Sequence, residues 1–245
     1  MKKYLLSATV SLLMFTNSFA QFGNIKNAFE KVVNQPSSTG SFTENEAGQA
    51  IKEALTKGIT IGVDKVSVVN GFLKNDLIKI PFPENAKKAE STLRSMGLGS
   101  QIDKMVETMN HAAEDAAKEA TPIFIGAIKQ MTVKDAIGII NNKQQDAATV
   151  YLQNATTEAL VSSFKPHIKL ALDKLNATKY WSDMMIQYNK IPFVQKVETD
   201  LPDFVTRKAI KGLFYMISQE EIKLRQDASA RTSDILKKVF GNIKL

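Results

Sequence analysis

Apolar residues recur at helical spacing along most of this chain. The clearest run covers residues 100–131, where seven of them share one helix face: Ile102, Val106, Met109, Ala113, Ala116, Ala120 and Ile123. No stretch shows a convincing strand pattern of alternating apolar and polar residues. The pattern therefore predicts eight to ten helices and an all-α fold, arranged as a single globular domain over residues 43–245.

Helix start signals precede several of these runs. Thr43 and Glu46 have the spacing of a capping box, and Thr132 with Asp135 marks a second helix start. Asp200 is a good N-cap for a helix that should reach about residue 226. These signals support the helical assignment independently of the apolar pattern.

Two prolines fall inside helical patterns. Pro122 is predicted to kink or split the run over residues 100–131. The helix that begins near residue 146 is predicted to end at about Pro166, because proline removes a main-chain donor and clashes with the preceding turn.

The tetrapeptide KIPF occurs twice, at residues 79–82 and 190–193. Each proline disfavours helical backbone in the residue before it, so Ile80 and Phe82 should be extended. We interpret both copies as short linkers that pack Ile and Phe onto helices. A clamp over an apolar ligand, pairing of the two copies as strands, and an ancient duplication are the alternatives.

Methionine and aromatic residues are frequent enough to fill a core or to line a flexible cavity. If a cavity exists, five residues are the candidates for binding an apolar ligand: Phe72, Ile80, Phe82, Met105 and Met109.

The first twenty residues have the features of a secretory signal. Lys2 and Lys3 precede the apolar run YLLSATVSLLMF, and Ser18 and Ala20 place small residues before a cleavage site at Gln21. Residues 21–42, which contain the stretch NQPSSTGS, are predicted to form an N-terminal arm and linker. No transmembrane candidate follows residue 20.

The chain has no cysteine, which excludes disulfides, thiolate metal sites and a lipidated cysteine after the signal. We therefore expect a periplasmic protein, with full secretion as the second choice. The net charge is +7, and residues 161–245 hold 15 basic and 9 acidic residues. This basic third could bind anionic lipid, although no run of five like charges occurs and a mixed solvated surface is the simpler interpretation.

Residues with catalytic or metal-binding chemistry are few. The two histidines, His111 and His167, have no metal-ligand spacing, and His111 is expected on the exposed face of its helix. The chain has no glycine-rich phosphate loop and no Gly-x-Ser-x-Gly motif. We predict no cofactor, no metal site and no nucleic-acid partner.

One acidic residue stands on an apolar helix face. Glu220 shares the face of Leu213 and Leu224, and a carboxylate there must be paired or protonated. The candidate buried polar cluster consists of Glu220, Glu221, Arg225, Arg231 and Arg207. It is either a structural ion-pair cluster or the acid–base group of a hydrolase or lyase.

Four segments together resemble a known family: NGFLKNDLIKIPFP (70–83), MTVKDAIGII (131–140), AATVYLQNATTEAL (147–160) and the run over residues 200–241 that begins DLPDFVTRKAIKGLF. In this order they resemble the exported bacterial family catalogued as domain of unknown function 4197. The resemblance implies a helical protein of the bacterial envelope and no particular reaction. It also implies an aspartate where this chain has Asn70.

The sequence leaves three hypotheses about function. The first is a non-catalytic envelope module that binds a protein partner or an apolar ligand. The second is a hydrolase or lyase that uses Glu220 as general acid or base. The third is peripheral binding to anionic lipid through the basic C-terminal third.

Overall fold

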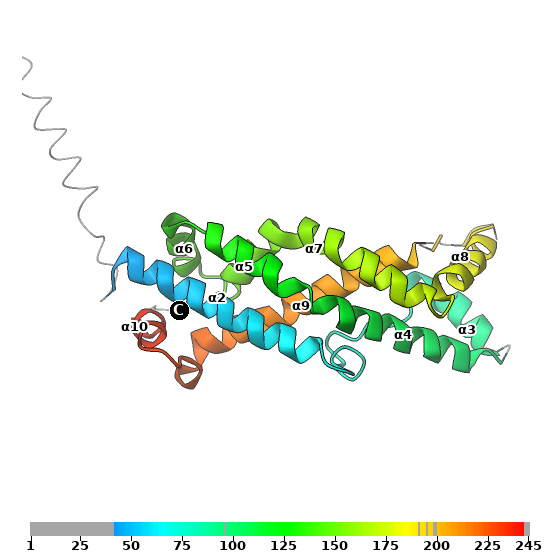
Figure 1. Cartoon of the computed structure of the whole chain (residues 1–245). Coiled ribbons are helices and arrows are strands. Elements are labelled where there is room, and N and C mark those ends of the chain that lie inside the picture. The colour runs from blue at the N-terminus through cyan, green and yellow to red at the C-terminus, as the bar shows by residue number, and fades with distance from the viewer. Residues whose placement is uncertain (1–41, 96, 191, 195, 198–199, 243–245) are drawn as a thin grey trace, which may run out of the picture. The chain divides into compact units, whose positions relative to one another are not determined.

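A computed structural model describes residues 42–242, apart from residues 96, 191, 195, 198 and 199 (Figure 1). The predicted export signal over residues 1–20 lies outside this part of the chain, as does all but the last residue of the predicted arm over residues 21–42. Both assignments stay predictions.

The described residues form nine α-helices and no strand, which confirms the all-α prediction. The helices are α2 (Glu44–Val66), α3 (Lys87–Ser95), α4 (Gly99–Ala117), α5 (Ala120–Gln130), α6 (Val133–Ile140), α7 (Ala147–Asp173), α8 (Ala177–Tyr188), α9 (Leu201–Gln226) and α10 (Asp234–Asn242). Two short 3-10 turns, Glu84–Ala86 and Ala228–Ala230, connect some of them. Within these residues, no helix has both the length and the apolar character needed to cross a membrane.

The core lies between four helices. The long helices α7 and α9 pack against each other, α2 packs mainly on α9, and α4 packs on both α7 and α9. Figure 1 shows α6 and α10 beside α2 at one end of this bundle, and α3 and α8 at the other end. An open groove lies at the end formed by α3, α4 and α8.

The sequence signals for helix starts correspond to real caps. The Thr43 and Thr132 side chains each accept a hydrogen bond from the main chain three residues later, and Glu46 and Asp135 reciprocate. Asp200 accepts from the backbone N–H of Asp203. These local bonds satisfy donors that a helix start leaves without internal partners.

Pro122 and Pro166 behave differently. The run over residues 100–131 is split as predicted, but the break lies at residues 118–119, and Pro122 sits in the first turn of α5, where no main-chain donor is lost. The predicted end at Pro166 is wrong, because α7 continues to Asp173. Fully buried side chains on both sides of the proline hold the two halves in one helix: Leu160, Phe164, Ile168 and Leu172.

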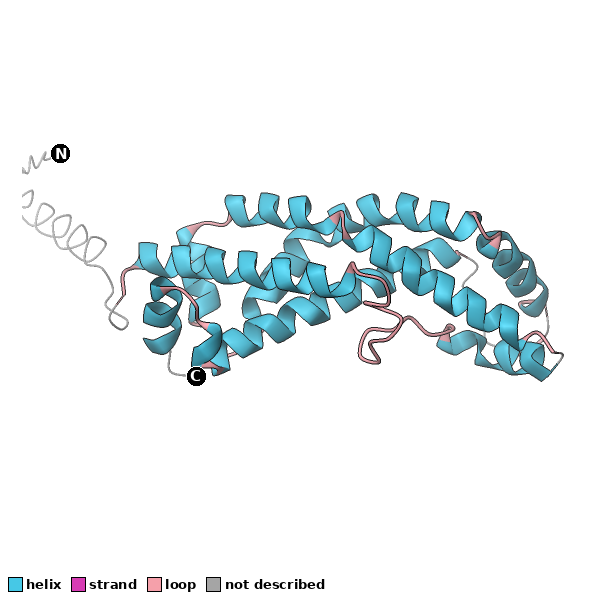
Figure 2. Ribbon diagram, turned by 60° about the horizontal axis from the view of Figure 1, so that its bottom comes forward, coloured by secondary structure: helices cyan, strands magenta, loops and turns pink. Residues whose placement is uncertain are grey.

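The first KIPF copy belongs to the core. Ile80 and Phe82 are 1% and 3% exposed, and the Phe82 ring packs edge-on against Trp181 with ring centroids 5.2 Å apart. Figure 2 shows this segment within the long loop that follows α2. In the second copy Phe193 is fully exposed. Phe82 and Phe193 therefore have different environments, and the prediction that both copies pack their phenylalanine onto helices holds for Phe82 and is wrong for Phe193.

Candidate ligand-binding groove

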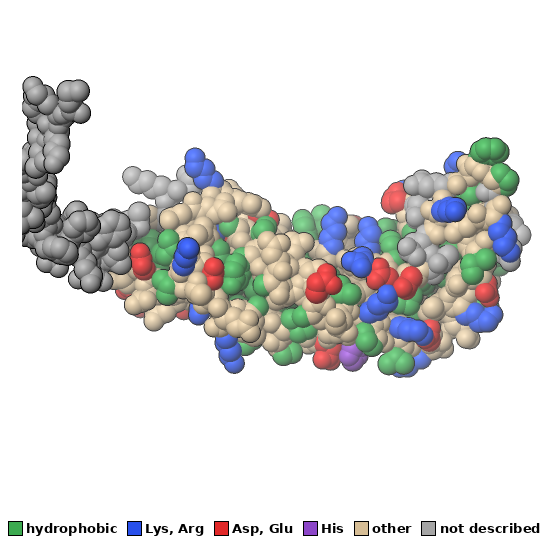
Figure 3. Space-filling model, turned by 90° about the horizontal axis from the view of Figure 1, so that it is seen from above, with side chains coloured by type: hydrophobic (Ala, Val, Ile, Leu, Met, Phe, Trp, Pro, Cys, Tyr) green, Lys and Arg blue, Asp and Glu red, His purple; other side chains and the backbone are tan. Residues whose placement is uncertain are grey.

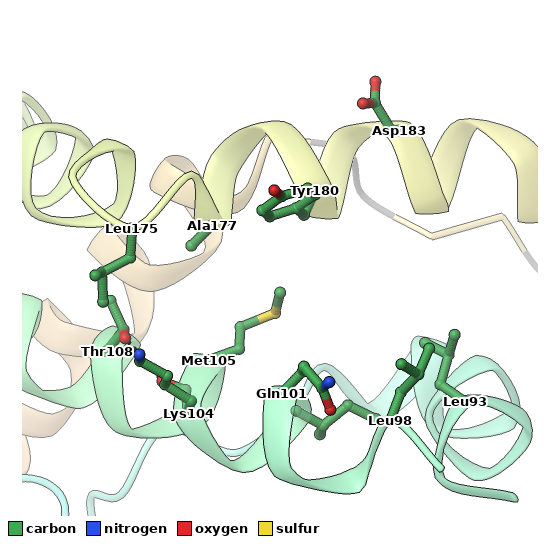
Figure 4. Close-up of a pocket in the computed structure, with 11 residues that line it drawn as sticks. Leu93, Leu98, Gln101, Lys104, Met105, Thr108, Leu175, Ala177, Tyr180 and Asp183 are labelled. Carbon is green, nitrogen blue, oxygen red and sulfur yellow. Dashed lines mark hydrogen bonds between the residues drawn. The ribbon is translucent and has the colours of Figure 1, made fainter. Parts of the chain in front are cut away.

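An open groove of about 600 Å³ lies between α4 and α8 and reaches α3. Its lining is mostly apolar and includes Leu93, Leu98, Ile102, Met105, Leu175 and Tyr180. Figure 4 shows Met105 reaching up from α4 and the Tyr180 ring reaching down from α8 toward it. This volume is within the range of sites that bind small molecules.

The groove exists because the helices at this end present apolar side chains that nothing else in the described chain covers. Ile102 on α4 and Ala177 on α8 are buried residues of its lining. Tyr180 is 62% exposed, Leu175 48% and Leu98 37%, so three large apolar residues stand in water around one hollow. Clustered apolar exposure of this kind is typical of a binding surface, whereas single exposed apolar residues are ordinary.

Four polar residues complete the lining: Gln101, Lys104, Thr108 and Asp183. The Thr108 hydroxyl donates to the Lys104 carbonyl at 2.7 Å, and the Asp183 carboxylate accepts from Lys179 at 2.9 Å. In Figure 4 Asp183 points away from the groove. Lys104, Gln101 and the hydroxyl of Tyr180 are thus the lining groups able to meet a ligand, and the Gln101 side-chain oxygen also accepts from the Ser100 hydroxyl at 3.4 Å.

The five predicted apolar-binding residues separate into two groups. Met105 lines the groove. Phe72, Ile80, Phe82 and Met109 are each at most 3% exposed and belong to the core.

The predicted polar cluster divides among three places. Glu221 and Arg225 form a buried pair, with Arg225 Nη2 2.9 Å from Glu221 Oε1. The Glu221 carboxylate also accepts from the backbone N–H groups of Ala148 and Thr149 at 3.0 and 2.8 Å, and so caps the start of α7. Arg231 lies nearby and donates to the carbonyl of Arg225 at 2.6 Å. Together these contacts tie α9 to α7 and to the chain that follows α9.

Glu220 has a different partner from the arginines that the sequence suggested. Its side chain is 12% exposed, and its carboxylate lies 2.5 Å from Lys65 Nζ on α2. It also borders a shallow hollow of about 230 Å³ with Lys223 and Ser229. Arg207 lies on the same helix 13 positions before Glu220, and it pairs with Asp203 at 2.7 Å. Glu220 and Arg207 therefore do not join the Glu221–Arg225 pair.

Sequence reasoning missed a second buried acidic residue, Glu114 on α4, which is 3% exposed. Its carboxylate accepts from the backbone N–H groups of Asn70, Phe72 and Leu73 at 3.0–3.1 Å. His111 Nδ1 lies 2.6 Å from the same carboxylate. This hydrogen bond raises the pKa of His111 above its ordinary value. His111 is therefore a partner of a buried acid and not only a solvated side chain.

One turn earlier on α4, Asn110 is fully buried. Its amide exchanges two hydrogen bonds of 2.8 Å with the backbone of Ile80, accepting from the N–H and donating to the carbonyl. A side chain thus supplies the main-chain bonds that a strand partner would have made. Asn110 and Glu114 together fix both ends of the segment over residues 70–80.

Charge is mixed on the molecular surface. In the space-filling view of Figure 3, basic and acidic side chains alternate across the face that is seen. Several basic residues of the C-terminal third are paired, among them Lys165 with Asp203, Lys179 with Asp183 and Lys238 with Glu46. These pairs favour the interpretation of a solvated surface over that of a concentrated lipid-binding patch.

Comparison with known proteins gives one match. The sequence profile of DUF4197, described as a protein of unknown function, matches residues 41–241. No curated protein and no solved structure matches the chain.

Proposed function

This chain belongs to the DUF4197 family of proteins of unknown function, and we propose that it is a non-catalytic module that binds an apolar small molecule in the groove between α4 and α8. One observation carries this proposal. A hollow of about 600 Å³ is lined by large apolar side chains from three helices, several of them exposed to water. Covering that surface with a ligand removes apolar area from water, which supplies about 25 cal/mol for each Å² buried.

The hydrogen bonds and ion pairs that the acidic side chains make support binding rather than catalysis. Glu114 and Glu221 each accept hydrogen bonds from backbone N–H groups, so their carboxylates are engaged in holding segments together. Glu220 is engaged by Lys65. A carboxyl group that acts as general acid or base must lie within reach of a substrate proton. Asp183 is the carboxylate of the groove lining, and it is paired with Lys179.

We place this binding activity in the bacterial envelope, with the periplasm first and secretion second. The support is the signal-like start of the chain, with Lys2 and Lys3 before an apolar run and small residues at positions 18 and 20. A fusion of residues 1–20 to a reporter that is active only outside the cytoplasm tests this part. Activity that is no higher than that of a reporter without the fusion contradicts it.

Ligand binding is tested with N-phenyl-1-naphthylamine, a neutral dye that becomes fluorescent in apolar surroundings. We expect saturable binding to the wild-type protein and loss of binding in Tyr180→Asp, which puts a charge into the middle of the groove. Ile186→Asp is the matched control, because Ile186 is an exposed apolar residue of the same helix, 45% exposed, outside the groove lining. Equal binding by the two variants contradicts the assignment of the site.

Mass spectrometry under native conditions gives a second test on protein purified from its own host. A bound small molecule in the wild-type protein that is absent from Tyr180→Asp supports the proposal. Recovery of the wild-type protein without a bound molecule, together with no dye binding, contradicts it.

A further inference from the structure

We infer that the ligand is a single-chain amphiphile with one negative charge, whose headgroup lies beside Lys104 and whose hydrocarbon chain extends past Met105 and Tyr180. This inference rests on the proposed function, because it concerns the occupant of the same groove. It goes beyond that function by assigning the charge and the direction of the ligand.

The distribution of side chains along the groove indicates in which direction the ligand lies. In Figure 4, Leu93 and Leu98 stand at one end and Lys104 stands at the other, near Leu175 and Thr108. Met105 and Tyr180 face each other between these ends. Gln101, which lies between Met105 and Leu98 in the same view, is uncharged, so the positive charge of the lining is confined to the Lys104 end. A ligand with a charged headgroup at that end and a hydrocarbon chain toward Leu98 and Leu93 matches this arrangement, whereas an entirely apolar molecule leaves the Lys104 ammonium group without complementary contact.

The charges of the lining residues indicate the sign of the charge on the ligand headgroup. Lys104 and Asp183 are the two ionised lining residues, and the Asp183 carboxylate is neutralised by Lys179 at 2.9 Å. Among the described residues, no carboxylate lies within ion-pair distance of the Lys104 ammonium group. Of the acids closest in sequence, Asp103 pairs with Arg94 at 2.8 Å and Glu107 lies 3.6 Å from His111 Nε2. The remaining positive charge favours an anionic headgroup and disfavours a cationic one.

The Lys104 side chain suits this role in a second way. Its four methylenes can lie along the apolar wall while the ammonium group stays at the water boundary, where a headgroup also stays hydrated. The ion pair is then exposed to solvent, so it contributes a preference rather than most of the affinity. Apolar burial in the rest of the groove supplies the larger part.

The test compares dodecanoate with dodecan-1-ol as competitors of the neutral dye, both below the concentration at which they aggregate. We expect Lys104→Gln to weaken dodecanoate binding about threefold to fivefold, as for a solvent-exposed ion pair. Binding of dodecan-1-ol should change by less than about twofold, since it has no charge to lose. Lys129→Gln is the matched control, because it removes one exposed charge from α5, outside the lining.

Salt provides a second readout that does not depend on a substitution. Added sodium chloride should weaken dodecanoate binding to the wild-type protein relative to dodecan-1-ol, and this difference should vanish in Lys104→Gln. If dodecan-1-ol displaces the dye while dodecanoate binds equally to wild type and Lys104→Gln, the headgroup inference is wrong and the proposed function stands. If neither compound displaces the dye, and no dye binds saturably, the proposed function fails and the inference with it.

Discussion

The carboxylate of Glu114 accepts a hydrogen bond of 3.0 Å from the backbone N–H of Phe72, a residue 42 positions earlier in the chain. The same carboxylate binds the N–H groups of Asn70 and Leu73, so one side chain of α4 organises the turn that follows α2. Asn70 occupies left-handed backbone with φ of 69°, a conformation that asparagine tolerates better than most residues. Asn70 therefore acts through its backbone, which adopts the left-handed conformation and donates its N–H to Glu114.

Replacing Glu114 by Gln should destabilise the protein by about 3 kcal/mol. The change removes a charged acceptor of one buried and two partly buried N–H groups. It also introduces an amide group, whose two N–H donors can then point toward these N–H groups. Chemical unfolding measures the loss, and hydrogen exchange should show faster exchange of residues 70–73. Glu107→Gln is the control on the same helix, because Glu107 is 57% exposed and should change stability by less than about 0.5 kcal/mol. Equal stability of the two variants would show that the Glu114 contacts contribute little.

The contrast between local and distant interactions explains what the sequence could predict. The capping pairs at Thr43 and Thr132 depend on residues three positions apart, and both were found from spacing alone. The contacts of Glu114 with Phe72 and of Asn110 with Ile80 span 42 and 30 positions. Helical periodicity says which face a residue occupies but not which loop lies against that face, so these contacts had no local signal.

Two adjacent glutamates of α9 make the same point. Glu220 and Glu221 are adjacent, and periodicity favoured Glu220 as the buried one. Glu221 is more deeply buried because the start of α7 lies against it and supplies N–H donors. Glu220 meets Lys65 of α2 instead. The groove was also beyond prediction, since it depends on where α8 packs relative to α4, although Met105 was among the candidates.

Stability should depend on pH through His111. Its hydrogen bond with Glu114 raises its pKa in the folded state, so folding favours the protonated form. The stabilisation is complete below the unfolded pKa of about 6.5 and is lost as the pH rises through the folded pKa. We expect wild-type protein to lose less than about 1 kcal/mol over this window, because His111 is partly exposed and the interaction is screened. Unfolding measured from about pH 5.5 to 8.5 should show that His111→Gln removes this part of the pH dependence.

His167→Gln is the control for that measurement, because it removes the other histidine and leaves the Glu114 contacts unchanged. The interpretation fails if His111→Gln retains the wild-type pH profile. It also fails if the wild-type protein becomes more stable, rather than less stable, across the same rise in pH.

The adjacent acids of α9 should respond differently to the same substitution. Glu221→Gln should cost about 3–5 kcal/mol, because it leaves the buried Arg225 charge without its partner and weakens the cap of α7. Glu220→Gln should cost at most about 1 kcal/mol, because Lys65 is 50% exposed and the pair is close to solvent. Denaturant midpoints of both variants check this order. A larger loss for Glu220→Gln would reverse our assignment of the structural residue.

Gly212 on α9 packs closely against the loop over residues 70–80, and a larger residue there tests this contact. A β-carbon added there would lie 2.7 Å from Cε1 of Phe72 and 3.1 Å from Cβ of Ile78. Phe72 is fully buried, so its ring cannot move aside without disturbing the turn that Glu114 holds. We therefore expect Gly212→Ala to destabilise the protein by about 1–3 kcal/mol, although alanine is the better helix former.

Gly138→Ala in α6 is the matched control for Gly212→Ala. A β-carbon there meets no atom within 4 Å, so only the helix propensity should count. The control should raise stability by about 0.5–1 kcal/mol, the usual advantage of alanine over glycine inside a helix. Urea unfolding of both variants should therefore give changes of opposite sign. If Gly212→Ala is stabilising like the control, the loop over residues 70–80 does not pack on α9 as closely as this structure requires.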